Sequence, residues 1–296
     1  MLVLGVISCA PAEPPIGPAN ETDKPPSPIM AMAPSLLDDE RIAAALAKTE
    51  WVGRIHTDAM RELVARRKEL MRGPGTPHER ACRAVYQLVL KYAPQFDQAA
   101  GIARSEAKRR EAVEAVVRSN ERCAGSAAMS VFGAPAGTMP SASMLAMDDS
   151  VTGAFEPYVA AIESGVQSTD GSPSAVSSVV SGVLSGAAGI PTADLELVAG
   201  VGSVAIASSE EWSAVQGSGG FEGCNPEVCG YEMSVFSRGS VRRGPLAVIA
   251  AADAVGGIAG LYIAWVSGVR EGSALINITA MSAAAASAMM FISFFL

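Results

Sequence analysis

Apolar side chains recur every three to four residues over 35–122, the spacing that places them on one face of an α-helix. Three acids, Asp38, Asp39 and Glu40, open this region and favour a helix N-terminus, since negative charge complements the helix dipole. No alternation of polar and apolar residues competes with this interpretation. The pattern predicts a helical bundle over 36–122, with one helix from about residue 35 and others at about 50–72, 76–92 and 95–122.

The third of these helices has the most specific start signal. A Gly-Pro-Gly turn precedes Thr76, Pro77 and Glu79, which occupy the N-cap, N1 and N3 positions of a capping box. In this motif the Thr hydroxyl and the Glu carboxylate each accept a hydrogen bond from a backbone N–H. We expect the helix to end just before Pro94, because proline disrupts a helix interior.

Beyond residue 122 the chain becomes rich in small residues and acidic. Residues 123–150 contain mainly Gly, Ala, Ser, Pro and Met and are expected to form a linker. Periodicity then predicts an acidic helical region over 151–237, with helices at about 151–167, 174–188 and 193–212. Residues 123–237 contain twelve acids and neither Lys nor Arg. Such a segment repels phosphate backbones, so no nucleic-acid partner is expected.

The C-terminal residues 245–296 carry only three charges, Asp253, Arg270 and Glu271. The pair Arg270 and Glu271 separates two apolar runs, 246–269 and 272–296, and each is long enough to cross a bilayer as a helix. The sequence therefore predicts an all-α fold in which the bundle is followed by a small-residue-rich apolar helical hairpin.

Small residues recur at every fourth position of the first apolar run: Ala252, Gly256, Gly260, Ala264 and Gly268. A helix face with so little side chain allows another backbone to approach closely. We expect this face to pack against the second run, to associate with a second copy in a homo-oligomer, or to insert in a membrane. Burial of both helices against the body is the alternative, since Asp253 and the weak hydrophobicity of Ala, Gly and Ser oppose insertion.

The N-terminus has the features of a bacterial lipoprotein. Residues 1–8 are interpreted as a signal peptide, because an apolar run ends at Ser8 and is followed by Cys9, a lipidation candidate. The run is short and lacks a preceding Lys or Arg, which a start assigned too far downstream would explain. An ordinary apolar N-terminus is the alternative. Eight prolines between residues 10 and 34 predict a semi-rigid tether over 9–35. We expect attachment to the membrane of the bacterial cell envelope.

The other four cysteines are an even number, as an oxidising compartment favours. Cys82 and Cys123 lie on neighbouring predicted helices, and Cys224 and Cys229 flank a turn, so each pair is a candidate disulfide. Three pairings are open, and free thiols are the alternative. The spacing without a nearby His does not indicate a metal site.

Motifs for catalysis are scarce. The chain contains no phosphate-binding Gly-Lys-Ser/Thr loop, no GxSxG and no HExxH. Its two histidines, His56 and His78, are interpreted as solvated or capping residues. We expect no enzymatic activity and no cofactor. Two alternatives stay open: a two-span membrane protein with a cytoplasmic body, and an enzyme or small-molecule-binding domain whose cavity gathers His56 with Asp58 or Glu62.

Three segments carry a family resemblance. Residues 51–57, Trp-Val-Gly-Arg-Ile-His-Thr, resemble a VGxxHN segment, with Thr57 where Asn is usual. Residues 205–212 resemble a late helix-plus-aromatic segment, and residues 252–260 resemble a terminal ADxxGAxxG tail. Together they resemble a family of uncharacterised bacterial lipoproteins, which implies export and a helical fold but no activity. We therefore expect a non-enzymatic envelope or surface lipoprotein whose tail self-associates or inserts, as in a bacteriocin-like protein.

Overall fold

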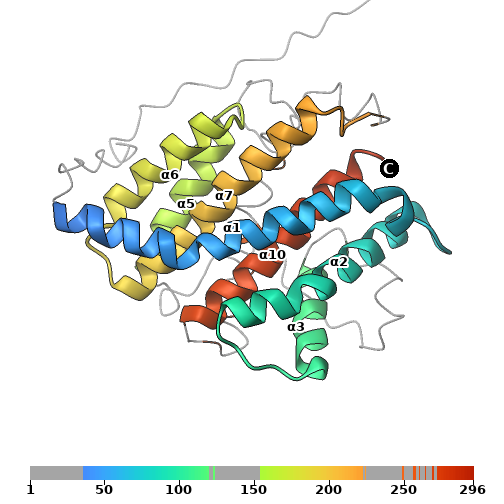
Figure 1. Ribbon diagram of the computed structural model, residues 1–296, viewed down its shortest axis with the longest axis horizontal. Coiled ribbons are helices and arrows are strands. Elements are labelled where there is room, and N and C mark those ends of the chain that lie inside the picture. The colour runs from blue at the N-terminus through green and yellow to red at the C-terminus, as the bar shows by residue number, and fades with distance from the viewer. Residues whose placement is uncertain are drawn as a thin grey trace, which may run out of the picture. The chain divides into compact units, whose positions relative to one another are not determined.

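The computed structural model describes residues 36–119, 154–222 and 272–296, together with single residues between these ranges: Cys123, Cys224, Ile249, Gly256, Gly257, Gly260, Ala264 and Val269. Helices without strands make up the regular structure of these residues (Figure 1), which confirms the predicted all-α fold. Residues Ala33–Leu296 form one compact unit. The predicted leader and tether, with Cys9, and the predicted linker after Cys123 lie outside the described residues.

The first helix, α1, runs unbroken over Leu36–Leu70. The prediction of two helices with a gap near residue 50 was therefore wrong. No proline lies in this stretch, and the apolar face continues across the expected gap through the buried Ala45 and Val52. Thr49 is fully buried there, and its hydroxyl donates to the Ala45 carbonyl at 2.9 Å, so the helix itself satisfies this polar group.

Helix α2 spans Pro77–Ala99 and begins with the predicted capping box. The Thr76 hydroxyl accepts from the Glu79 N–H at 3.2 Å, and the Glu79 carboxylate accepts from the Thr76 N–H at 2.7 Å. The expected end before Pro94 was wrong, because burial of the neighbouring side chains holds the helix past this proline.

The helix ends instead at Ala99, and Gly101 in the following turn has a positive φ of 70°. Glycine adopts this left-handed conformation without the steric cost that other residues incur. Helix α3 then covers only Glu106–Ser119, so the predicted helix over 95–122 is divided by this turn.

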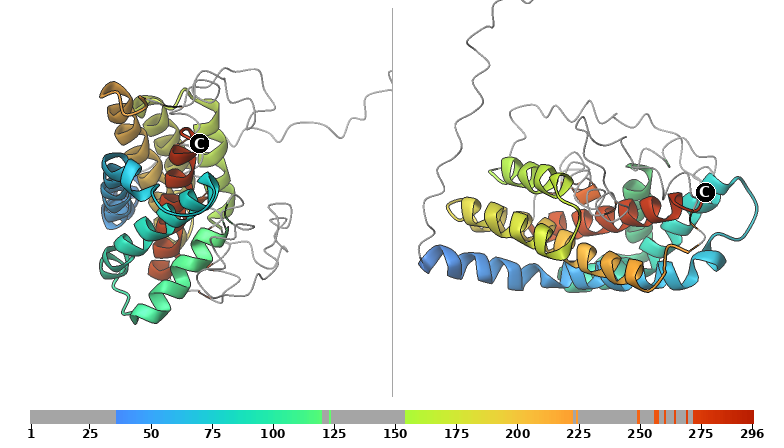
Figure 2. Two further views of the ribbon diagram at one scale, coloured as in Figure 1. Left: turned by 90° about the vertical axis from the view of Figure 1, so that its right-hand side faces the viewer. Right: turned by 90° about the horizontal axis from the view of Figure 1, so that it is seen from above.

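The acidic region folds close to expectation into α5 (Glu156–Ser168), α6 (Pro173–Ala187) and α7 (Thr192–Gly217). Helices α1 and α7 lie side by side and run parallel, as the view from above in Figure 2 shows. Two ion pairs join them, Lys48 with Glu196 at 2.8 Å and Arg61 with Glu211 at 2.8 Å. Two acids of this region thus pair with basic groups of α1.

The last helix, α10, spans Gly272–Ser293 and packs against α1, α2 and α7 (Figure 1). Among the described residues it is the one helix long and apolar enough to cross a membrane. Its most apolar 18-residue stretch is 94% buried inside the protein. Most of its circumference therefore contributes to the core, which explains why its sequence is apolar on every side.

Candidate functional site

Two glycines of the predicted small-residue face lie against α10. A Cβ built on Gly256 would lie 2.5 Å from the Ala286 Cβ and 2.9 Å from the Ser282 carbonyl oxygen. On Gly260 it would lie 2.6 Å from the Ser282 Cβ and 2.9 Å from the Ile278 carbonyl oxygen. A step of four residues forward in the first run moves the contact about four residues back along α10. The glycines therefore meet α10 in antiparallel order, at a distance that only glycine permits.

Ala264, a third position of this face, is fully buried. Ala252 and Gly268 lie outside the described residues. Gly256 and Gly260 cannot face α10 and a second copy of the chain at the same time. Self-association or insertion through this face would need its contact with α10 to open.

A buried polar cluster fixes the start of α10 to the body. The Asp97 carboxylate, at the end of α2, accepts from Arg104 Nη1 at 2.6 Å, from Arg109 Nε at 2.8 Å and from Asn277 Nδ2 of α10 at 3.2 Å. Arg104 Nη1 also donates to Asn277 Oδ1 at 2.9 Å. Both Asp97 and Asn277 are almost completely buried, so each depends on these partners in place of water.

The other end of α10 lies in an aromatic cluster. Trp212 of α7 is fully buried, and its Nε1 donates to Ser287 Oγ at 3.2 Å. Its ring centroid is 4.8 Å from that of Phe291. The Arg67 guanidinium lies 3.4 Å from the centroid of the Phe295 ring, a cation–π contact, and burial lowers the pKa of this group.

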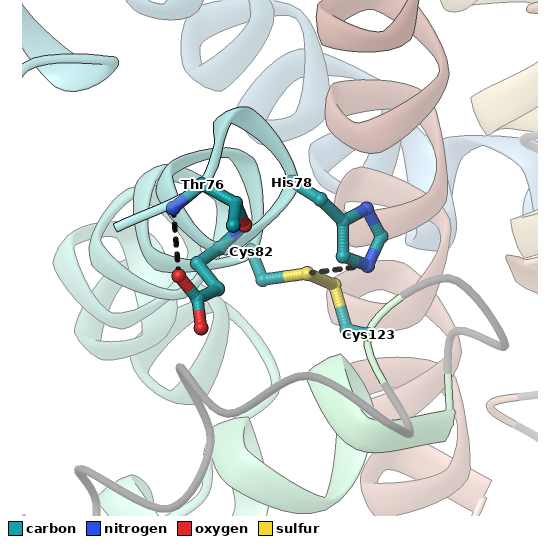
Figure 3. Close-up of a disulfide and its surroundings, with 5 residues drawn as sticks. Thr76, His78, Cys82 and Cys123 are labelled. Carbon is teal, nitrogen blue, oxygen red and sulfur yellow. Dashed lines mark hydrogen bonds between the residues drawn. A yellow bond between two sulfur atoms is a disulfide. The ribbon is translucent and has the colours of Figure 1, made fainter. Parts of the chain in front are cut away.

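The structure contains a disulfide between Cys82 and Cys123, one of the candidate pairings that the sequence left open. Their Cα atoms are 5.7 Å apart, and both residues are fully buried. Figure 3 shows the His78 ring beside it, with Nε2 3.9 Å from Cys82 Sγ. Cys224 is also disulfide-bonded. Cys229 lies outside the described residues, so the predicted pairing of these two stays a prediction.

A surface groove of about 540 Å³ follows the seam between α1 and α7. Its floor is set by Gly53, where an added Cβ would lie 2.7 Å from the Ser203 carbonyl oxygen. Because the backbones of α1 and α7 approach closely at Gly53, the longer side chains of the two helices form the walls of the groove on either side. Charged groups on these walls are Glu50, Arg54, Asp58, Arg61 and Glu210.

The charged groups of the groove differ in whether they have an ion-pair partner. Arg61 forms an ion pair with the buried Glu211 of α7. Glu50, Arg54, Asp58 and Glu210 are exposed, and none of them forms an ion pair with another residue that the structure describes. Three carboxylates and one guanidinium are thus available to a ligand. Groups of three or more potential metal ligands do not occur among the described residues.

The groove does not gather the residues that were expected to mark a catalytic or ligand-binding cavity. It includes Asp58 but neither His56 nor Glu62. His56 is fully buried in the middle of α1, so its interpretation as a solvated or capping residue was wrong. Glu62 pairs with Arg66 at 2.6 Å. A repeat of Glu50, Arg54 and Asp58 at four-residue spacing was visible in the sequence, but it does not reveal α7, which comes about 150 residues later and forms the other wall.

Comparison with known protein families, curated proteins and solved structures gives no match. The resemblance to bacterial lipoproteins over residues 51–57, 205–212 and 252–260 therefore stays a prediction. The contacts of these segments can still be described. Gly53 packs against α7, Trp212 packs on α10, and Gly256 and Gly260 contact α10. Each of the three segments thus lies at a helix–helix contact.

Proposed function

We propose that this protein is a non-enzymatic lipoprotein of the bacterial cell envelope, anchored through Cys9, whose C-terminal apolar helices form the core of the body that it presents. The observation that carries this proposal is the Cys82–Cys123 disulfide. Disulfides persist in oxidising compartments outside the cytoplasm. Both sulfur-bearing residues are inaccessible to solvent, which supports a structural and not a catalytic role for this bond.

The contacts of α10 support the packing role of the C-terminal helices over bilayer insertion. Asn277 and Ser287 have partners in the body, and a helix that moved into lipid would lose them. Much of the remaining surface is Ala and Ser, which gain little from transfer into hydrocarbon. Membrane attachment is then supplied by the lipid at Cys9, and the Pro-rich tether holds the body away from the surface.

The redox state of Cys82 and Cys123 in protein taken from cells tests the export that this proposal requires. Cys82 and Cys123 are expected to resist alkylation under denaturing conditions until a reductant is added. A two-span membrane protein with a cytoplasmic body would instead keep both thiols reduced. Free thiols at both positions would overturn the proposal.

Lipidation is tested separately by growth with labelled palmitate. The native chain is expected to incorporate the label, and a Cys9→Ala chain is not. Equal labelling of the two chains, or no labelling of either, would refute the anchor at Cys9. The thiol experiment would still decide whether the protein is exported.

A further inference from the structure

The groove between α1 and α7 has a charge pattern that selects among ligands. Glu50 and Asp58 on α1 and Glu210 on α7 surround Arg54, and none of these four has an ion-pair partner in the described part of the chain. Carboxylates outnumber the available guanidinium by three to one. The groove therefore repels anions such as phosphate and attracts a ligand with more positive than negative groups.

The surfaces between these charges are small or apolar. Leu46 and Ala47 line the groove from α1, and Ile206 and Ala207 line it from α7. Such a surface can contact the alkyl chain of a ligand while the charged groups at the two ends of the chain reach the walls. The stems of Lys and Arg side chains pack along apolar surfaces in the same way. The volume of about 540 Å³ lies within the usual range of small-molecule sites, roughly 300–1,000 Å³.

We propose that this groove binds a basic amino acid, free or at the end of a short peptide. Arg54 pairs with the ligand carboxylate, which a guanidinium can contact through two parallel hydrogen bonds. The ammonium groups lie toward Asp58 and Glu210, and the alkyl chain follows Ile206. The Gly53 contact positions both walls, because any larger residue there would push α7 away from α1.

The exposure of these charges sets the strength of binding. Ion pairs between exposed groups are screened by water, so each contributes only about a twofold to fivefold gain in affinity. Two or three such pairs together gain only about fourfold to hundredfold, so the ligand is expected to dissociate with a constant of roughly ten millimolar or more. This places the interaction within reach of titration by nuclear magnetic resonance.

The experiment titrates the full chain with L-lysine and follows the backbone amide signals. Saturable shifts are expected at Gly53, Ser203 and Ala207, in the groove floor. L-Norleucine has the same zwitterion and a chain of similar length without the terminal ammonium, whereas cadaverine has both ammonium groups without the carboxylate. L-Norleucine is expected to bind at least about twofold to fivefold more weakly than L-lysine, because it lacks the pair made by the terminal ammonium. Cadaverine lacks the pair with Arg54, so its binding reports the contacts of the ammonium groups alone.

Three variants assign the contacts. Arg54→Gln should weaken L-lysine binding and leave cadaverine binding unchanged, and the double change Asp58→Asn with Glu210→Gln should weaken both. Glu40→Gln is the matched control, because Glu40 is an exposed acid of α1 outside the groove.

All of these side chains are exposed, so thermal unfolding should be nearly the same in every variant, which excludes misfolding as the cause of lost binding. Absence of saturable groove shifts at ten times the expected constant would overturn the proposal. So would equal affinity for L-lysine and L-norleucine, or equal weakening by Glu40→Gln.

Discussion

Replacing Gly260 by Ala tests the contact between the small-residue face and α10. The new Cβ would lie 2.6 Å from the Ser282 Cβ and 2.9 Å from both the Ile278 carbonyl oxygen and the Thr279 Cα. Two of these three atoms belong to the backbone, so rotation of a side chain cannot relieve the clash. Either α10 or the segment that carries Gly260 must move.

The size of the effect follows from comparison with Gly182, a helical glycine of α6. A Cβ built on Gly182 meets nothing within 4 Å. Alanine is favoured over glycine in a helix by roughly 0.5–1 kcal/mol, and both substitutions gain this amount. Gly260→Ala alone incurs an overpacking cost of about 1–3 kcal/mol. The free energy of unfolding should therefore be about 1–3 kcal/mol lower for Gly260→Ala than for Gly182→Ala.

Urea unfolding followed by circular dichroism measures this difference, provided that the slope against urea is the same for both variants. Gly182→Ala should be as stable as the native chain or slightly more so. If Gly260→Ala matched it, the close approach of this glycine to α10 would be refuted, and with it the assignment of the small-residue face to internal packing.

Three other predictions concern the disulfide, the buried carboxylate and a half-buried acid. Changing both Cys82 and Cys123 to Ser should lower the free energy of unfolding by about 2–4 kcal/mol, because the bond closes a loop of sequence separation 41; urea unfolding checks this, and unchanged stability would contradict it. Asp97→Ala should cost about 3–5 kcal/mol in thermal unfolding, since it leaves two arginines without their anion, and a loss below about 1 kcal/mol would show that the cluster does not hold α10. Burial raises the pKa of Glu163 above its ordinary value of 4.5. The hydrogen bond from Gln167 lowers this pKa, but its effect is smaller than that of burial. The folded state therefore binds this proton more tightly than the unfolded chain, so the carboxylate destabilises the fold only as pH rises from about 4.5 through the raised pKa. Glu163→Gln should be more stable than the native chain at neutral pH and equal to it in acid, and the opposite order by thermal unfolding would disprove the burial effect.

Local signals in the sequence located some elements and misplaced others. The Thr76 capping box fixed the start of α2, because its hydrogen bonds join residues only three positions apart. Pro94 was expected to end the same helix, but burial of Ala93 and Phe96 on either side outweighs the lost hydrogen bond. Helix α2 ends just before Gly101 instead, and the sequence alone does not show that this glycine adopts a positive φ.

The surroundings of α10 and the groove depend on contacts between distant parts of the chain. Asn277 lies in an apolar run, and its partner Asp97 lies 180 positions earlier in the sequence. The repeat of Glu50, Arg54 and Asp58 at four-residue spacing did not indicate that α7 forms the other wall of the groove. Helical periodicity shows which face of a helix is apolar, and it does not show which helix covers that face.

Fractionation of an exported chain without its lipid tests most directly whether the C-terminal helices are the core of the body. In this chain a cleavable signal sequence that is not lipidated replaces residues 1–9. Because α10 is buried and its polar groups are satisfied internally, the protein is expected in the soluble fraction, with Cys82 and Cys123 oxidised. Retention in the membrane fraction after washing at high salt would contradict the account, since it would mean that the C-terminal helices bind the bilayer themselves.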